Sequence, residues 1–231
     1  MKGILYGIGT GPGDPELLTI KAVNAIQKCG VIAVPETGSG ERTAFSIIEK
    51  YLGDKELLEC RFVMEKDAAK RKEARQVVAG QIIQILDNGK DVGFITLGDP
   101  TTYSTYMYVH EIVVNEGFEA KIIPGITSYS AAAAAFGIAL CEGDEILTVI
   151  PAGYSEDIDK LLSYPGNKVL MKSGVNMTRV LEKLKLLGYG DRTKIACRVT
   201  MSDQQLYTSA EEYERSPEVD YFTLMIVKEK A

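Results

Sequence analysis

Two loops of this chain spell Gly-Asp-Pro, at Gly13–Pro15 and at Gly98–Pro100, and each stands between a strand-like apolar run and a helical pattern. A third glycine loop, Pro124–Ser128, follows the next apolar run. Glycine lets backbone amides approach a ligand closely, and open α/β sheets bind small molecules in the loops that follow their strands. Three such loops in 231 residues therefore predict a small-molecule site.

The aspartates in two of these loops, Asp14 and Asp99, indicate which charge the ligand carries. A carboxylate repels a pyrophosphate across a low-dielectric gap, whereas it is favourable beside a cation. The dinucleotide-binding fingerprint also fails, because Pro12 stands where its third glycine is needed, and the chain has no Walker A sequence. These observations favour an adenosine-like ligand with a positive centre, such as S-adenosylmethionine.

Each of these residues also has a purely structural interpretation. Asp14 before Pro15 is typical of an N-cap followed by proline at the first helical position. Asp99 can be interpreted either as a turn stabiliser or as a ligand contact, because Pro100 keeps it out of the helical region. His110 lies on the apolar face of its predicted helix, which favours a packed or hydrogen-bonded histidine over a catalytic one.

Composition narrows the class of protein. Hydrophobic residues make up 45% and charged residues 25%, as in globular chains, and no apolar run reaches the roughly 20 residues of a membrane helix. The first residues lack a signal-peptide layout, so we expect a cytoplasmic protein. A net charge of -6 disfavours nucleic-acid binding, and a single histidine disfavours His-rich metal sites and His-based triads. The scattered cysteines predict reduced, buried thiols and no metal site; they are Cys29, Cys60, Cys141 and Cys197.

The order of the predicted elements changes along the chain. The first part alternates strands at 4–8, 31–34 (ended by Pro35), 92–97 and 120–123 with helices at 19–29, 43–51, 66–88 and 104–115, which indicates parallel crossover units. The second part has strands at 146–150, 168–171, 194–199, 205–208 and 221–227, and clear helices only at 156–162 and 177–187. We therefore predict an α/β fold of two domains, 1–117 with a mainly parallel sheet and 118–231 with a mixed sheet.

Read together and in order, these stretches resemble the tetrapyrrole methylase family. The resemblance rests on the Gly7–Thr19 start, the Gly98–Tyr103 loop, the Pro124–Ser128 loop and a closing strand at Tyr221–Val227, and it spans almost the whole chain. Within the family the chain is most similar to precorrin-2 or cobalt-factor II C(20)-methyltransferases, on weaker patterns that include Tyr103–Tyr108 and Val169–Lys172.

The resemblance implies two α/β domains with S-adenosylmethionine in the cleft between them, a tetrapyrrole substrate, and a homodimer. It implies cofactor contacts in both domains, from Pro12, Leu97, Gly98, Asp99, Thr102, Tyr103, Thr127 and Ser128, and from Met171, Lys172, Thr200, Phe222 and Thr223. It also implies that a ring carbon attacks the sulfonium methyl group, with Asp99 and Tyr103 as candidate catalytic assistants for the later loss of a proton.

The substrate class raises a question of charge, because a macrocycle that bears many carboxylates needs local basic groups on an acidic protein. The first residues to consider are Arg42, Arg61, Lys172 and Arg198. The chain could also methylate another position of a tetrapyrrole, with uroporphyrinogen III as one such substrate. A module that binds an adenosine ligand without catalysing a reaction is a further alternative.

Overall fold

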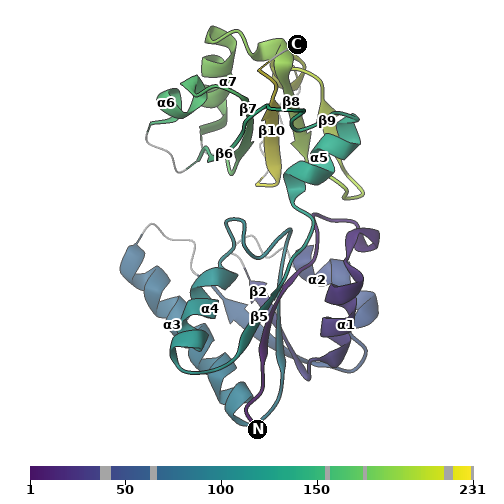
Figure 1. Cartoon of the computed structure of the whole chain (residues 1–231), viewed down its shortest axis with the longest axis vertical. Coiled ribbons are helices and arrows are strands. Elements are labelled where there is room, and N and C mark those ends of the chain that lie inside the picture. Colours follow the sequence, from purple (N-terminus) through teal and green to yellow (C-terminus); the bar gives the residue numbers. More distant parts are fainter. Residues whose placement is uncertain (37–42, 63–66, 154–156, 174–175, 216–220, 230–231) are drawn as a thin grey trace. The chain divides into compact units, whose positions relative to one another are not determined.

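A computed structural model describes residues 1–36, 43–62, 67–153, 157–173, 176–215 and 221–229 (Figure 1). The chain forms two compact units, Met1–Thr127 and Ser128–Ala231, here called the N-terminal and C-terminal units, and each contains a five-stranded sheet. The boundary predicted at 117/118 falls too early. Strand β5 (Ala120–Ile123) pairs in parallel with β1 (Leu5–Gly9), so it completes the first sheet.

The sheet of the N-terminal unit is parallel throughout and has the strand order β3-β2-β4-β1-β5. Its remaining strands are β2 (Val31–Glu36), β3 (Glu56–Arg61) and β4 (Val92–Thr96). The chain first moves from β1 out to β3, then returns to β4 and passes β1 to reach β5. The direction changes between the adjacent strands β1 and β4, which is the place where open α/β sheets bind ligands beyond their carboxyl ends.

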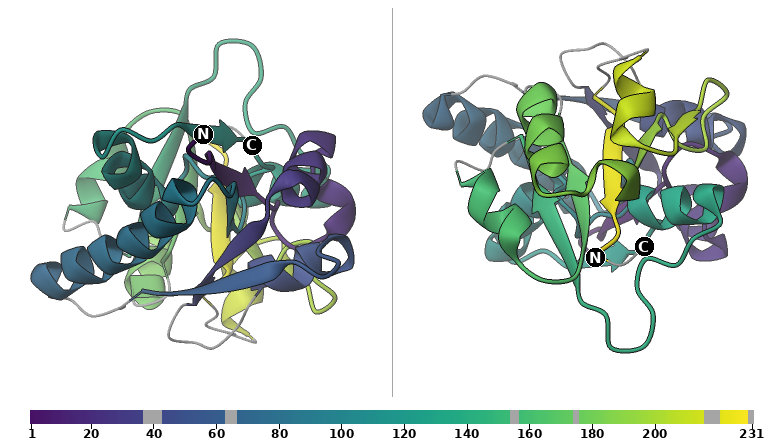
Figure 2. Two further views of the ribbon diagram at one scale, coloured as in Figure 1. Left: turned by 90° about the horizontal axis from the view of Figure 1, so that it is seen from below. Right: turned by 90° about the horizontal axis from the view of Figure 1, so that it is seen from above.

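Helices cover both faces of this sheet (Figures 1 and 2). One face carries α1 (Ile20–Lys28), α2 (Thr43–Ile48) and the short 3-10 helix η2 (Glu49–Tyr51), and the other carries α3 (Ala68–Asp87) and α4 (Tyr106–Asn115). Alternate residues of β1 face the two cores: Leu5 packs with the α3 and α4 cluster, and Ile8 packs with the α1 and α2 cluster. Both side chains are fully buried, so the sheet is fixed from both sides.

Two strands differ from the prediction. Pro35 does not end β2, because the strand continues to Glu36 and Pro35 lies opposite Cys60 of β3. The pairing of β2 with β4 stops at Ala33, so on that side no partner strand lies opposite the proline, which has no amide hydrogen to donate. The edge strand β3 was not predicted, because most of its residues are exposed and its sequence has no apolar run.

The mixed sheet of the C-terminal unit is confirmed, with the order β6-β7-β10-β8-β9. Strand β6 (Leu147–Pro151) is parallel to β7 (Asn167–Met171), whereas β10 (Thr223–Val227) runs antiparallel to β7 and to β8 (Thr193–Cys197). Strand β9 (Gln205–Tyr207) is antiparallel to β8. The helices are α5 (Ser128–Phe136), α6 (Ile158–Ser163), α7 (Met177–Leu186) and α8 (Ala210–Glu214), of which α8 was not predicted.

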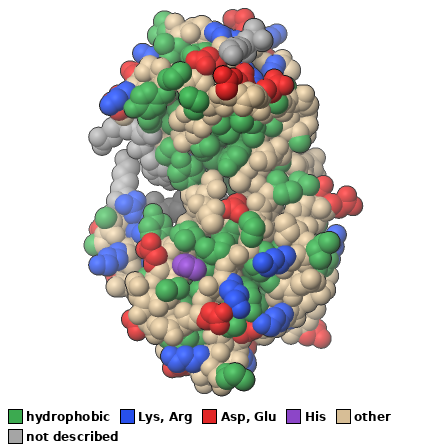
Figure 3. All heavy atoms as spheres, viewed as in Figure 1, with side chains coloured by type: hydrophobic (Ala, Val, Ile, Leu, Met, Phe, Trp, Pro, Cys, Tyr) green, Lys and Arg blue, Asp and Glu red, His purple; other side chains and the backbone are tan. Residues whose placement is uncertain are grey.

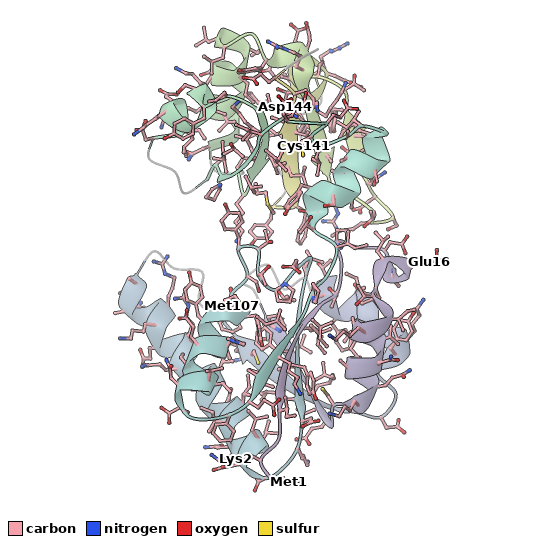
Figure 4. The ribbon with its side chains drawn as sticks, viewed as in Figure 1. Met1, Lys2, Glu16, Met107, Cys141 and Asp144 are labelled. Atoms are coloured by element: carbon pink, nitrogen blue, oxygen red, sulfur yellow. The ribbon has the colours of Figure 1, made fainter. Side chains whose placement is uncertain are left out.

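The loop between α5 and β6, which carries Cys141 and Asp144 in Figure 4, is tied to the C-terminal sheet by a polar cluster. Asn167 Nδ2 donates to Leu140 O and to Glu145 Oε2, both at 2.8 Å, and Lys228 Nζ lies 3.2 Å from the same carboxylate. The Asn167 bond, a backbone bond within the loop and the Lys228 bond hold the pKa of Glu145 below its usual value. Cys141 is exposed, so the prediction of buried thiols is correct for Cys29, Cys60 and Cys197 only; none of the four forms a disulfide.

Gly7 of β1 tests the packing of the N-terminal core. An added Cβ would lie 2.1 Å from the ring of Tyr106, which is fully buried and has no room to move. We expect Gly7→Ala to lower the free energy of unfolding by about 1–3 kcal/mol through overpacking. Urea denaturation followed by circular dichroism measures the change.

Gly80 in α3 is the matched control, because a Cβ there would meet nothing within 4 Å. We expect Gly80→Ala to raise the stability by about 0.5–1 kcal/mol, since alanine loses less backbone entropy in a helix. Equal unfolding midpoints for the two variants would contradict this account.

Candidate functional site

The first two glycine loops are joined to each other beyond the carboxyl ends of β1 and β4. Gly98 N donates to Gly11 O at 2.7 Å, and Gly11 N donates to Gly98 O at 3.3 Å, which forms an isolated antiparallel bridge. Both glycines have positive φ angles, +74° at Gly11 and +72° at Gly98, a conformation that side chains rarely adopt. The two loops therefore form one rigid structure at the switch point of the sheet.

The third loop lies against the same structure. Gly125 N donates to Asp99 Oδ2 at 2.9 Å. An added Cβ on Gly125 would lie 2.1 Å from Gly98 O, and one on Gly9 would lie 2.6 Å from Gly125 N. The backbones of the three loops are thus in contact, and glycine is required at these positions by that contact.

Asp99 acts as a turn stabiliser in this structure. Its Oδ1 accepts hydrogen bonds from Thr101 N at 2.8 Å and from the Thr101 hydroxyl, and Asp99 is only 8% exposed. Asp14 caps the 3-10 helix η1 (Pro15–Leu17), as predicted, by accepting from Glu16 N at 2.8 Å. Glu16, labelled in Figure 4, lies on that helix.

Strained backbone marks several of the predicted cofactor residues. Among the described residues, the non-glycine positions with positive φ are Tyr103, Lys172, Arg198 and Thr200, with values between +50° and +66°. Three of them were predicted to contact the cofactor, and Arg198 is one of the basic residues considered for the substrate carboxylates. Such conformations cost about 1–3 kcal/mol each and concentrate at ligand sites.

One edge of the C-terminal sheet gathers the predicted residues of that unit. Lys172 follows the end of β7, Thr200 follows β8 by three residues, and Thr223 begins the antiparallel β10 between them. Arg198 N donates to Phe222 O at 3.3 Å, and the side chains of Cys197 and Thr223 lie 3.2 Å apart. Met171 O accepts from Ala152 N at 2.9 Å, which brings the end of β6 to the same edge.

This edge has polar groups that the sequence did not reveal. The Ser173 hydroxyl is fully buried and has no hydrogen-bond partner among the described residues, and burial lowers the pKa of the neighbouring Lys172. Gly153 fits against the Lys172 carbonyl, where a Cβ would lie 2.0 Å from the oxygen. A buried hydroxyl without a partner is costly, because it has lost its hydrogen bonds to water.

The basic residues considered for the substrate carboxylates have different surroundings. Arg61 pairs with Glu36 at 3.3 Å, and Arg198 pairs with Asp203 at 2.6 Å, which lowers the pKa of that carboxyl. Their charges are therefore already balanced. Arg42 lies outside the described residues. On the face shown in Figure 3, acidic and basic side chains are interspersed.

Helix α5 begins at Ser128, directly after Thr127 of the third loop. His110 is hydrogen-bonded, as favoured, because the Tyr106 hydroxyl lies 2.9 Å from its Nδ1. Within the described ranges, no cluster of three potential metal ligands occurs, and no helix is long and apolar enough to cross a membrane.

These features define a class of protein: two α/β units, with glycine loops gathered at the switch point of a parallel sheet and strained residues at one edge of a mixed sheet. The model of the Tetrapyrrole (Corrin/Porphyrin) Methylases matches residues 4–213. The chain belongs to this family.

Three curated relatives resemble the chain over nearly its whole length. A probable cobalt-precorrin-2 C(20)-methyltransferase of Methanocaldococcus jannaschii is 34% identical, covering 97% of this chain and 95% of the relative. A precorrin-2 C(20)-methyltransferase of Sinorhizobium is 31% identical with the same coverage. The cobalt-precorrin-2 C(20)-methyltransferase of Salmonella typhimurium is 30% identical, covering all of this chain and 98% of the relative.

Solved structures support the fold. The cobalt precorrin-4 methyltransferase CbiF gives a TM-score of 0.77 at 22% identity, covering 97% of this chain and 94% of that one. The uroporphyrin-III C-methyl transferase of Thermus thermophilus, complexed with S-adenyl homocysteine, gives 0.73 at 20% identity and covers 98% of both chains.

His110 offers a pH test, because it is the only histidine. Burial lowers its pKa in the folded protein below the ordinary 6.5, so the unfolded chain binds the proton more readily. The stability contribution of the neutral ring is complete above pH 6.5 and is lost as the pH falls through the lower, folded pKa. We expect His110→Gln to flatten the dependence of the unfolding temperature on pH just below 6.5, as measured by thermal denaturation. Parallel curves for the two proteins would contradict this.

Proposed function

We propose that this protein is an S-adenosylmethionine-dependent methyltransferase of cobalamin biosynthesis that methylates C(20) of precorrin-2 or of cobalt-factor II. The observation that carries the proposal is the set of relatives named for this reaction, at 30–34% identity over at least 97% of the chain. The proposed product of the donor is S-adenosylhomocysteine. A homodimer and a cytoplasmic location stay predictions.

The residues present fit S-adenosylmethionine. The joined loops bring backbone groups of Gly11 and Gly98 to the switch point of the sheet, and the carboxylate of Asp99 lies at the same edge. A fixed negative charge disfavours a phosphate ligand and is compatible with a sulfonium. In the C-terminal unit, the Ser173 hydroxyl is buried and has no partner among the described residues, and such a group could hydrogen-bond a polar edge of the cofactor.

The cofactor supplies an activated methyl group, so the protein's own task is to bind, orient and exclude water. The residues proposed to hold the cofactor are those that the resemblance implied in the two units: Pro12, Leu97, Gly98, Asp99, Thr102, Tyr103, Thr127, Ser128, Met171, Lys172, Thr200, Phe222 and Thr223. Most of them lie beyond strand ends or at the start of β10, where the described backbone is held by bridges between loops and strands.

Of the two proposed catalytic assistants, Tyr103 is the better placed to meet a substrate. It is 42% exposed, and its φ of +51° holds it in a conformation that tyrosine rarely adopts. Asp99 is 8% exposed and accepts hydrogen bonds with both carboxylate oxygens. We therefore assign the handling of the proton to Tyr103 in this proposal.

Methyl transfer tests the function directly. We expect label from methyl-labelled S-adenosylmethionine to appear in precorrin-2 or in cobalt-sirohydrochlorin, and the form that accepts it identifies the physiological substrate. Uroporphyrinogen III and a later precorrin serve as control acceptors, and transfer to one of these alone would replace the proposed position. Binding of adenosylhomocysteine without transfer to any macrocycle would favour a non-catalytic adenosine-binding module.

Tyr103→Phe tests the role of the hydroxyl while it keeps the ring and the strained backbone. We expect kcat to fall at least tenfold, within the range typical of a lost proton-transfer group, with unchanged affinity for adenosylhomocysteine. Steady-state kinetics and calorimetry measure the two quantities. Tyr108→Phe on α4 is the matched control, and equal kcat for the two variants would remove Tyr103 from the chemistry.

A further inference from the structure

We propose that Asp99 is a positioning residue for the proposed reaction: its carboxylate fastens the second loop to the third and so fixes the shape of the cofactor site. This inference rests on the proposed function, and it assigns Asp99 a role different from that of a proton acceptor. The contact that carries it is the 2.9 Å bond from Gly125 N to Asp99 Oδ2.

The bond joins two loops whose strands are not neighbours. Asp99 follows β4 and Gly125 follows β5, and β1 lies between these strands in the sheet. The bond therefore crosses the carboxyl end of β1, beside Gly9. A Cβ on Gly9 would lie 2.6 Å from Gly125 N and 2.7 Å from Gly98 O, so no side chain fits beneath the crossing. The backbone pairing within the sheet cannot supply this link, and a side chain must do so.

The chemistry of the three partners explains why the side chain is a carboxylate. Gly125 N, Thr101 N and the Thr101 hydroxyl all donate, and an ionised carboxylate only accepts. An asparagine in the same place would turn its amino group toward one of these donors. A charge that is only 8% exposed is tolerated because these charge-assisted bonds replace the lost water.

The same bonds make Asp99 a poor proton acceptor. A general base has to reach the proton that it removes, directly or through one water. Both Asp99 oxygens instead face groups of the protein, whereas Tyr103, four residues later, is substantially exposed. The geometry thus separates a residue that holds the loops from a residue that meets the ligand.

Binding of adenosylhomocysteine, measured by calorimetry on the full chain, tests this role without any chemical step. We expect Asp99→Ala to weaken binding about hundredfold and Asp99→Asn about tenfold, because they remove all or part of a set of charge-assisted bonds. Thr101→Val removes one donor and leaves the carboxylate in place, and we expect it to weaken binding about threefold.

Asp67→Asn is the matched control. Asp67 also accepts from two backbone amides, those of Ala69 and Lys70 at 2.8 and 3.3 Å, but it only caps α3. We expect this variant to bind adenosylhomocysteine as the unchanged protein does. Thermal denaturation of every variant identifies any that fail to fold, and Thr101→Val then still tests the link.

Kinetics separate positioning from base catalysis. Positioning predicts that Asp99→Asn raises KM for S-adenosylmethionine more than it lowers kcat, and that it leaves the pH profile of kcat in place. If Asp99→Asn and Asp99→Ala bind adenosylhomocysteine normally and both lose kcat together with the acidic limb of that profile, the role proposed here is overturned. If the unchanged protein does not bind adenosylhomocysteine, the proposed function itself fails, which is a different result.

Discussion

The site of the N-terminal unit depends on the close approach of three backbone segments beyond the end of β1. Gly9, Gly98 and Gly125 lie so near one another that an added Cβ on Gly9 or Gly125 would overlap backbone atoms of the other loops. A parallel sheet places its strand ends together but does not fix the loops that leave them. Here the Gly11–Gly98 bridge and the Asp99 carboxylate fix them. The glycines are therefore required first by the protein's own packing, and the surface available to a ligand is a consequence of that packing.

This arrangement explains why two similar Gly-Asp-Pro sequences do different work. Asp14 caps a short helix through the amide two residues later, a local contact that any turn of this kind could make. Asp99 makes the equivalent local contact to Thr101 with one oxygen, and it uses the other oxygen for a loop that is 26 residues away. The difference lies in the third loop, whose Gly125 amide donates to Asp99 across the end of β1.

The sequence predicted the parts of this structure that local chemistry determines. The parallel and mixed sheets, the cap at Asp14 and the hydrogen-bonded His110 follow from periodicity, turn residues and helical faces. Prediction from the sequence failed where contacts with residues far along the chain determine the structure. Strand β3 is held by β2 despite its exposed residues, the first unit extends to Thr127 because β5 pairs with β1, and Pro35 is tolerated because β4 stops pairing at Ala33. The Gly125 bond and the buried Ser173 hydroxyl are likewise contacts or environments that no spacing reveals.

Positive φ angles occur in both units, at glycines and, at Tyr103, Lys172, Arg198 and Thr200, at residues with side chains. The N-terminal unit uses glycine at Gly11 and Gly98, where positive φ costs little in the folded state. The C-terminal unit places Lys172, Arg198 and Thr200 in the same region of φ, where each side chain adds strain of about 1–3 kcal/mol. The side chain of Arg198 pairs with Asp203, and both residues lie between β8 and β9. Burial lowers the pKa of Lys172, so this strained residue also holds its amine in a setting that disfavours its charge.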